Sequence, residues 1–202
     1  MKGHIVKNKI VGWFSIGSTY TYLTALRMQD LMATRGFEMG IKPINIRHIM
    51  KSMNNIPFPP EKKEKVNYMW RDIERRAVNY GLPRPNVPAP YPLTNFDNAN
   101  LVGVVLNDMG LYLNYFNLTY QYWFIDGMEA GSEENIRRCL NDMTLDYNQI
   151  TELANSPEVT AKYEKNTFEA LELGVFGAPS FSVGNELFWG DDRLEDAISF
   201  SS

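Results

Sequence analysis

The strand patterns of this chain lie only near its two ends, and this placement most constrains the fold. Residues 10–16 and 37–46 have the short, β-rich composition of strands, and two more such runs, 181–183 and 187–189, come close to the end. Residues 95–173 carry helical patterns with short breaks instead. Because strands need partners for their backbone N–H and C=O groups, the sequence predicts one sheet completed from both ends of the chain.

The N-terminal part predicts a strand–helix–strand unit. The first strand runs into Gly17-Ser18-Thr19, after which apolar residues recur with helical spacing until Gly36, a residue typical of helix ends. The pattern from Phe37 to Ile46 then predicts the second strand. Near the other end, a turn at Gly184-Asn185 separates the last two strands, and a closing helix is expected from about Asp191 to Phe200.

The middle of the chain is divided by proline and charge. Lys51 to Pro60 is rich in Asn and Pro, so we expect an exposed loop there. Lys62 to Tyr80 is charged and has helical repeats, and the five prolines between 83 and 92 suit an extended connector. The sequence therefore predicts an α/β unit that is interrupted by a helical insertion.

The composition argues against two classes of partner. The chain has 202 residues, 44% of them hydrophobic, which is enough for one sizeable core. Its net charge of -4, without aromatic residues interleaved among Lys/Arg runs, gives no surface for a nucleic-acid backbone. The apolar stretch from Ile10 to Ile16 is too short to span a bilayer. We therefore expect no nucleic acid and no membrane as partners.

Cysteine usage points to a reducing compartment. Cys139 is the only cysteine, so the chain by itself forms no disulfide, no CxxC redox pair and no multi-cysteine zinc site. The two histidines, His4 and His48, lie far from the other candidate residues. We expect a cytoplasmic protein without a metal site, and we interpret Cys139 as a bystander.

Ser18 offers a hydroxyl where the first strand passes into the first helix. The N–H groups at a helix start lack partners within the helix, so this turn can accept an anion. One interpretation is that Ser18 only caps the helix, and the other is that it donates a hydrogen bond to a thiolate. A free thiol has a pKa of about 8.5, and a helix start (roughly 0.3–1 kcal/mol) plus a charged hydrogen bond (about 1.5–3 kcal/mol) lower it by about one to three units.

Pro179 lies in a second distinctive segment, Gly174 to Phe181, immediately before a predicted strand. A proline is unfavourable within a strand, and this suggests a cis peptide bond. Only about 5–6% of X-Pro bonds are cis, however, so the residues alone favour a trans bond.

These motifs resemble those of the family of 2-hydroxychromene-2-carboxylate isomerases and kappa-class glutathione transferases. Their order and spacing agree over nearly the whole chain. The motifs are Ser18-Thr19-Tyr20-Thr21-Tyr22-Leu23, Lys65-Val66-Asn67-Tyr68-Met69-Trp70-Arg71-Asp72, Gly174-Val175-Phe176-Gly177-Ala178-Pro179-Ser180-Phe181 and Leu187-Phe188-Trp189-Gly190-Asp191-Asp192-Arg193-Leu194. The resemblance implies a thioredoxin-like domain made of residues 1–60 and 174–202, with a helical insertion domain of residues 61–173 between the N-terminal βαβ and C-terminal ββα units.

The resemblance also implies where glutathione binds. Ser18 would be the catalytic serine that faces the glutathione sulfur. A cis bond would join Ala178 to Pro179, and Ala178 would pair with the cysteinyl backbone of glutathione by strand-like hydrogen bonds. Trp189 and Arg193 are interpreted as support, although Trp189 could simply pack under the last helix and Arg193 could be a solvated charge.

Further residues complete the implied site. Asn55 corresponds to an asparagine that contacts glutathione. Asp192, with Asp191 beside it, would hold the γ-glutamyl amine or neighbouring amides, because an ammonium group needs an anionic partner. The active-site lysine is Lys65 or Lys63, with Lys65 favoured, and it would hold the carboxylate or phenolate of the substrate.

By resemblance, the chain is a glutathione-dependent isomerase of 2-hydroxychromene-2-carboxylate or a related aromatic pyruvate. In this reaction a thiolate adds reversibly to a conjugated double bond, a single bond rotates, and elimination returns glutathione. The alternatives are a kappa-like transferase that forms a conjugate and a non-catalytic thioredoxin-like binding protein. The resemblance also implies a homodimer, with glutathione as cofactor and a small aromatic carboxylate as substrate.

Overall fold

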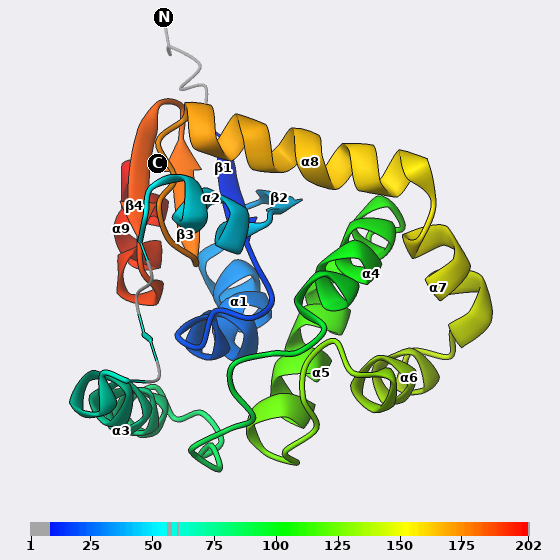
Figure 1. Cartoon of the computed structure of the whole chain (residues 1–202). Coiled ribbons are helices and arrows are strands. Elements are labelled where there is room, and N and C mark those ends of the chain that lie inside the picture. The colour runs from blue at the N-terminus through cyan, green and yellow to red at the C-terminus, as the bar shows by residue number, and fades with distance from the viewer. Residues whose placement is uncertain (1–8, 56–57, 60, 202) are drawn as a thin grey trace, which may run out of the picture.

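A computed structural model describes residues 9–55, 58–59 and 61–201, so His4 lies outside it. It has one mixed four-stranded sheet in the order β2-β1-β3-β4. The strand β1 (Ile10–Phe14) pairs in parallel with β2 (Met39–Pro43) and antiparallel with β3 (Ser180–Val183), and β3 pairs antiparallel with β4 (Glu186–Trp189). The two central strands therefore come from opposite ends of the chain, as the sequence predicts (Figure 1).

The first helix, α1 (Thr21–Arg35), ends at Gly36, which has the left-handed φ of 64° that favours glycine. The second strand is shorter than the predicted Phe37–Ile46, because a short helix, α2 (Ile46–Ser52), starts at its end. This helix also takes up the start of the loop predicted from Lys51. The side-chain oxygen of Asn45 accepts a hydrogen bond from the backbone N–H of His48 at 2.9 Å, and this cap begins the helix.

The helical insertion begins with α3 (Lys63–Asn79), which stands apart from the sheet in Figure 1. The proline-rich residues 83–92 contain no helix or strand. The remaining insertion helices are α4 (Phe96–Asp108), α5 (Tyr112–Phe124), α6 (Glu133–Asp142), α7 (Tyr147–Ala154) and α8 (Pro157–Glu172). The chain closes with a 3-10 turn, η1 (Asp191–Arg193), and with α9 (Leu194–Phe200), so the predicted closing helix is confirmed with a tighter first turn.

The sheet and the insertion share one hydrophobic core. The buried ring of Phe14 in β1 stacks on Phe116 of α5, with ring centroids 5.0 Å apart, and meets Phe181 of β3 edge-on at 5.8 Å. Helix α5 also packs against α1. The division of the chain into two domains stays a prediction, since the packing is continuous across it. In the described part of the chain, no helix has the length and apolar character needed to cross a membrane.

Candidate functional site

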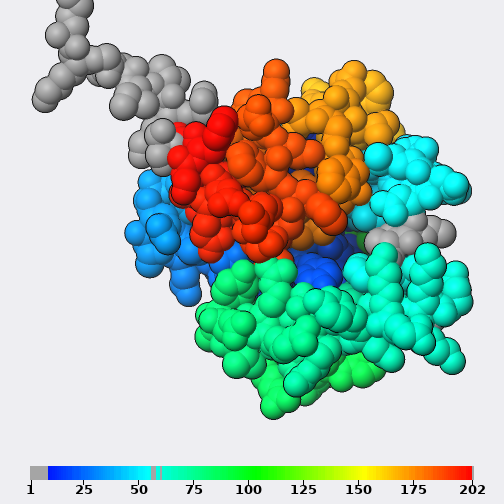
Figure 2. Space-filling model, turned by 90° about the vertical axis from the view of Figure 1, so that its left-hand side faces the viewer, coloured from blue at the N-terminus to red at the C-terminus, as the bar shows by residue number. Residues whose placement is uncertain are grey.

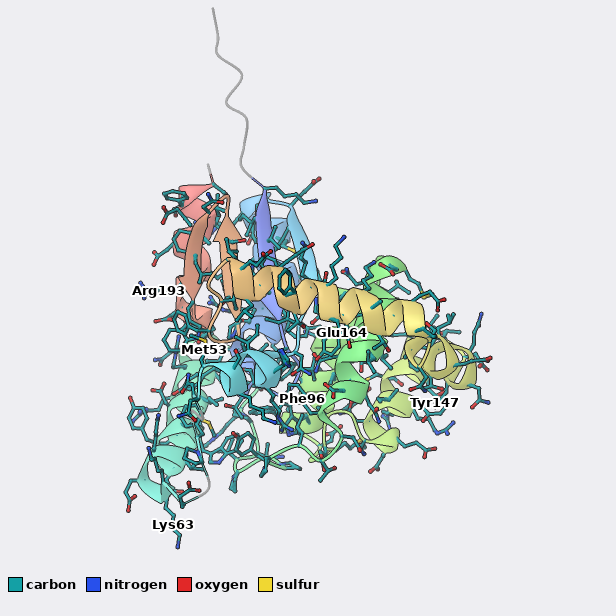
Figure 3. All side chains as sticks on the ribbon, turned by 45° about the horizontal axis from the view of Figure 1, so that its top comes forward. Met53, Lys63, Phe96, Tyr147, Glu164 and Arg193 are labelled. Carbon is teal, nitrogen blue, oxygen red and sulfur yellow. The ribbon has the colours of Figure 1, made fainter. Side chains whose placement is uncertain are left out.

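A cavity of about 910 Å³ opens where the two ends of the chain meet the insertion. Figure 2 shows a hollow between the orange-red C-terminal part and the green and cyan segments, with blue residues of the N-terminal part at its bottom. The cavity is lined by all the predicted site residues, namely Ser18, Asn55, Lys65, Ala178, Pro179, Asp191 and Asp192. Lys63 does not line it, and in Figure 3 it lies at the outer end of α3. The roles of these residues stay predictions, and their placement favours Lys65 over Lys63.

The Ser18 hydroxyl contacts the loop that leads into β3. Its Oγ donates a hydrogen bond of 2.6 Å to the backbone oxygen of Ala178. The interpretation of Ser18 as a helix cap is wrong, because the residue before α1 is Tyr20 and no side chain caps this helix. The hydroxyl therefore points at the Ala178–Pro179 loop, which forms part of the cavity wall.

The turn that carries Ser18 is held by the insertion. The fully buried side chain of Asn100 in α4 accepts from the N–H of Ile16 at 2.8 Å and donates to the oxygens of Ile16 and Phe96 at 2.9 and 3.0 Å. Tyr120 in α5 donates to the backbone oxygen of Ser18 at 2.8 Å. Buried polar groups with complete hydrogen bonding hold a single arrangement, so α4 and α5 position the hydroxyl.

A glycine is required immediately before Ser18. Gly17 has a φ of 124°, which side-chain-bearing residues rarely adopt, and a Cβ at this position would lie 2.3 Å from the ring of Phe96. The Phe96 ring at the start of α4 therefore packs directly against the backbone beside Ser18, and Phe96 also lines the cavity.

The loop on the other side of the hydroxyl is also supported closely. The Ala178–Pro179 bond is cis, as the resemblance predicts. A Cβ on Gly177 would lie 2.2 Å from Nε1 of Trp189, so the indole rests on this backbone. Trp189 is 53% exposed and lines the cavity, and the interpretation that it packs under the last helix is wrong. The N–H of Gly190 donates to the oxygen of Pro179 at 3.0 Å and fixes the loop after β4.

The two neighbouring aspartates have different surroundings. Asp191 is only 1% exposed, and its Oδ2 accepts from Arg76 of α3 at 2.8 Å, while its backbone oxygen accepts from Arg27. Burial raises the pKa of the Asp191 carboxyl to about 6, against the opposing effects of Arg76 and Arg27. Asp192 is exposed and pairs with Arg193 at 3.1 Å. Asp192 is therefore the more accessible partner for a ligand ammonium, while Asp191 joins η1 to α3.

Positive charge exceeds negative charge in the cavity, although the whole chain has a net charge of -4. Among the described residues, four cationic side chains line it against two aspartates. Of these, Arg47, Lys51 and Lys65 form no ion pair with any described residue, whereas Arg76 pairs with Asp191. A surplus of unpaired cations in a cleft attracts anionic ligands.

Sequence reasoning missed Arg47, Lys51 and Arg76. Arg47 and Lys51 are one turn apart on α2, and that short helix was itself not predicted. The capping residue Asn45 ahead of α2 was the signal that could have found it. Arg76 lies in a predicted helix, but its partner Asp191 is distant in sequence, so no local pattern connects them.

The protein's own thiol lies elsewhere. Cys139 of α6 is fully buried and does not line the cavity. Burial raises the pKa of its thiol to about 12, so this sulfur is not a nucleophile at neutral pH. Among the described residues there is also no group of three or more His, Cys, Asp or Glu side chains that could hold a metal ion.

A comparison with protein families identifies the family of this chain. The family model of the DSBA-like thioredoxin domain matches residues 9–199, which is almost the whole described chain. The chain belongs to this family. Within the DSBA-like thioredoxin family, the resemblance stated from the motifs is confirmed, and so is the thioredoxin-like fold.

Relatives with assigned names point in the same direction. The chain is 28% identical to a 2-hydroxychromene-2-carboxylate isomerase of Sphingobium xenophagum over 191 residues, which cover 93% of this chain and 95% of that protein. It is 21% identical to glutathione S-transferase kappa 2 of Caenorhabditis elegans, over 93% of this chain and 89% of that protein. The relatives named isomerases support an isomerase-like enzyme, and the transferase shows that kappa-class proteins are also relatives.

Solved structures show the same fold. That of a 2-hydroxychromene-2-carboxylate isomerase matches with a TM-score of 0.82 at 24% identity, covering 95% of this chain and 93% of that one. The cytosolic disulfide reductase DsbM of Pseudomonas aeruginosa, solved with GSH, matches with a TM-score of 0.58 at 11% identity over 95% and 96% of the two chains. At these identities the likeness concerns the fold alone.

Proposed function

We propose that this protein is a glutathione-dependent isomerase that acts on 2-hydroxychromene-2-carboxylate or a related aromatic pyruvate. The observation that carries the proposal is the Ser18 hydroxyl, 2.6 Å from the Ala178 oxygen in a cavity that no protein cysteine lines. A thiol-dependent reaction at this position needs a thiol from a ligand, because the only cysteine is buried elsewhere with a raised pKa. The isomerase-named relatives supply the reaction class.

The residues of the cavity fit glutathione, which carries one ammonium and two carboxylates. The N–H of Ala178 donates to no described residue, and its oxygen accepts only from Ser18. A peptide-like ligand can therefore pair with this backbone edge as a strand does. Asp192 offers an anion for the ammonium group, while Lys65 and Asn55, which also line the cavity, offer donors for a carboxylate.

Bound glutathione would supply a thiolate that adds to a conjugated double bond, allows rotation and is eliminated again. The contribution of the chain is to stabilise the thiolate at the Ser18 turn. When a ligand N–H takes over the Ala178 oxygen, the Ser18 hydroxyl is released from that bond and can donate to sulfur. Together with the start of α1, this hydrogen bond keeps the thiol ionised near neutral pH.

The proposal is tested by following the interconversion of 2-hydroxychromene-2-carboxylate and its open-chain aromatic pyruvate by absorbance. Glutathione is added in amounts well below the substrate, and free thiol is titrated before and after the reaction. The proposal predicts many turnovers per glutathione with the thiol fully recovered. Equilibration at the same rate with and without glutathione would contradict it.

The relationship to glutathione S-transferase kappa 2 favours one alternative, conjugation. In that case one thiol disappears for every substrate molecule consumed, and the same titration detects it. A non-catalytic binding protein would show neither turnover nor thiol loss. The proposal also retains the cytoplasmic location and the homodimer implied by the resemblance. Sedimentation of the purified protein tests the homodimer.

A further inference from the structure

The wall of the cavity beside Ser18 carries an arginine that the glutathione site does not use. Arg47 of α2 lies with its guanidinium 4.1 Å from the ring centroid of Phe96 and donates to the backbone oxygen of Leu93 at 3.2 Å. Leu93, Phe96 and Arg47 all line the cavity. In Figure 3 the Phe96 label lies beside α2. Arg47 is therefore held from two sides at a fixed place on the wall.

A single side chain, that of Phe96, lies between this arginine and the turn that carries Ser18. The Phe96 ring that supports the Arg47 guanidinium is the same ring that packs against Gly17, next to Ser18. The order along the wall is Arg47, Phe96, Gly17 and Ser18. A small molecule lying against Phe96 would reach the Ser18 hydroxyl at one end and the Arg47 guanidinium at the other.

The guanidinium has free capacity for an anion. A guanidinium has five N–H donors, and the contacts of Arg47 with described residues use one of them in a hydrogen bond. None of its contacts with described residues is an ion pair with a carboxylate. Lys51, one turn further along α2, also lines the cavity without an ion pair to the described residues. A planar, supported guanidinium suits a carboxylate, which it binds through two parallel hydrogen bonds.

The surrounding surface defines the rest of the ligand. Phe96, Leu93 and Tyr91 supply an aromatic and aliphatic wall beside the cation. Such a wall favours a flat unsaturated or aromatic body over a sugar or a phosphate ester.

We propose that Arg47, supported by Phe96, is the subsite that binds the carboxylate of the aromatic substrate. This inference rests on the proposed function, and it assigns Lys65 to glutathione rather than to the carboxylate of the substrate. Arg47 acts as a specificity residue, since it fixes the end of the substrate that lies away from sulfur.

The test compares binding of cinnamate and its neutral amide by calorimetry, in protein saturated with glutathione. We expect cinnamate to bind more tightly than the amide, and Arg47→Gln to weaken cinnamate binding by about ten- to a hundredfold while leaving the amide nearly unchanged. Glutamine keeps an amide donor but removes the charge and the guanidinium plane that lies on Phe96. Arg137→Gln is the matched control, because Arg137 also lies on an aromatic ring, 3.8 Å from the centroid of Tyr147, but outside the cavity.

The outcomes separate the two proposals. If glutathione binds and Arg47→Gln retains the preference for cinnamate, the carboxylate subsite is wrong and the proposed function stands. If Arg47→Gln loses glutathione binding instead, Arg47 belongs to the cofactor site and the subsite is also overturned. If native protein does not bind glutathione at all, the proposed function fails, and cinnamate binding measured without glutathione still decides the role of Arg47.

Discussion

The Oγ of Ser18 and the backbone oxygen of Ala178 are joined by a 2.6 Å hydrogen bond, although the two residues are 160 positions apart in the chain. The bond connects the turn after β1 to the cis-proline loop before β3. The Ser18 Oγ, to which the proposal assigns the stabilisation of a thiolate, therefore also joins the two loops of the candidate site. Changes that disturb either loop should reach this hydroxyl.

Asn100→Ala should destabilise the fold and weaken glutathione binding together. The substitution removes three hydrogen bonds from a fully buried amide to the backbone of Ile16 and Phe96, and we expect a loss of about 3 kcal/mol in the free energy of unfolding. Urea denaturation measures this loss, and calorimetry measures the affinity. Asn98→Ala, at an exposed position of the same helix, should change stability by less than about 0.5 kcal/mol. Equal effects of the two substitutions would contradict the role of Asn100.

Gly17→Ala should destabilise the protein more than a comparable glycine substitution elsewhere. Alanine at Gly17 meets both an unfavourable φ of 124° and the Phe96 ring, whereas Gly174, with a φ of 87°, has open space around it. Backbone strain of about 1–3 kcal/mol is common to both, and displacement of the ring adds roughly 1–3 kcal/mol only at Gly17. Thermal unfolding of the two variants measures the difference, and equal melting temperatures would show that the ring moves without cost.

The Asp191 carboxyl should make stability fall as pH rises from about 4 to 6. Its pKa is raised by burial from 3.8 to about 6, so the folded protein holds this proton where the unfolded chain has lost it. Stability from this group is therefore present below pH 4 and is lost as pH rises through 6, by about 3 kcal/mol at 1.4 kcal/mol per unit. The measurement is the difference in unfolding free energy between native protein and Asp191→Asn at several pH values. A difference that is independent of pH over this window would contradict the raised pKa.

Lys65→Gln should weaken glutathione binding about fivefold, since an exposed charge pair contributes up to about 1 kcal/mol. The loss should shrink at high salt, because added ions screen the interaction. Lys63→Gln is the matched control on the same helix, since Lys63 does not line the cavity. Equal glutathione affinities of the two lysine variants would contradict a role of Lys65 in glutathione binding.

Much of the framework was predictable, because its signals are local. Gly36 ends α1, Ser132 and Ser156 begin α6 and α8 with side-chain caps, and the strand runs at the chain ends do pair. These features depend on neighbouring residues. Helix α2 was missed because its seven residues are too few to show a helical period.

Most of the predicted site residues came from the resemblance, whereas their supporting partners depend on distant contacts. The sequence contains no sign that Asn100 holds the Ser18 turn, that Arg76 pairs with Asp191, or that Arg47 lies on Phe96. Each of these pairs joins the insertion or α2 to a remote segment. Such contacts appear only after the two ends of the chain have formed the sheet.

The central claim is that the Ser18 hydroxyl lowers the pKa of a thiol that a bound ligand supplies. The most direct measurement is the ultraviolet absorbance of the thiolate as a function of pH, with glutathione bound to native protein and to Ser18→Ala. The account predicts a bound-thiol pKa about one to three units below 8.5 in the native protein and a clearly higher value in the variant. Identical titration curves for two proteins that both bind glutathione would contradict it.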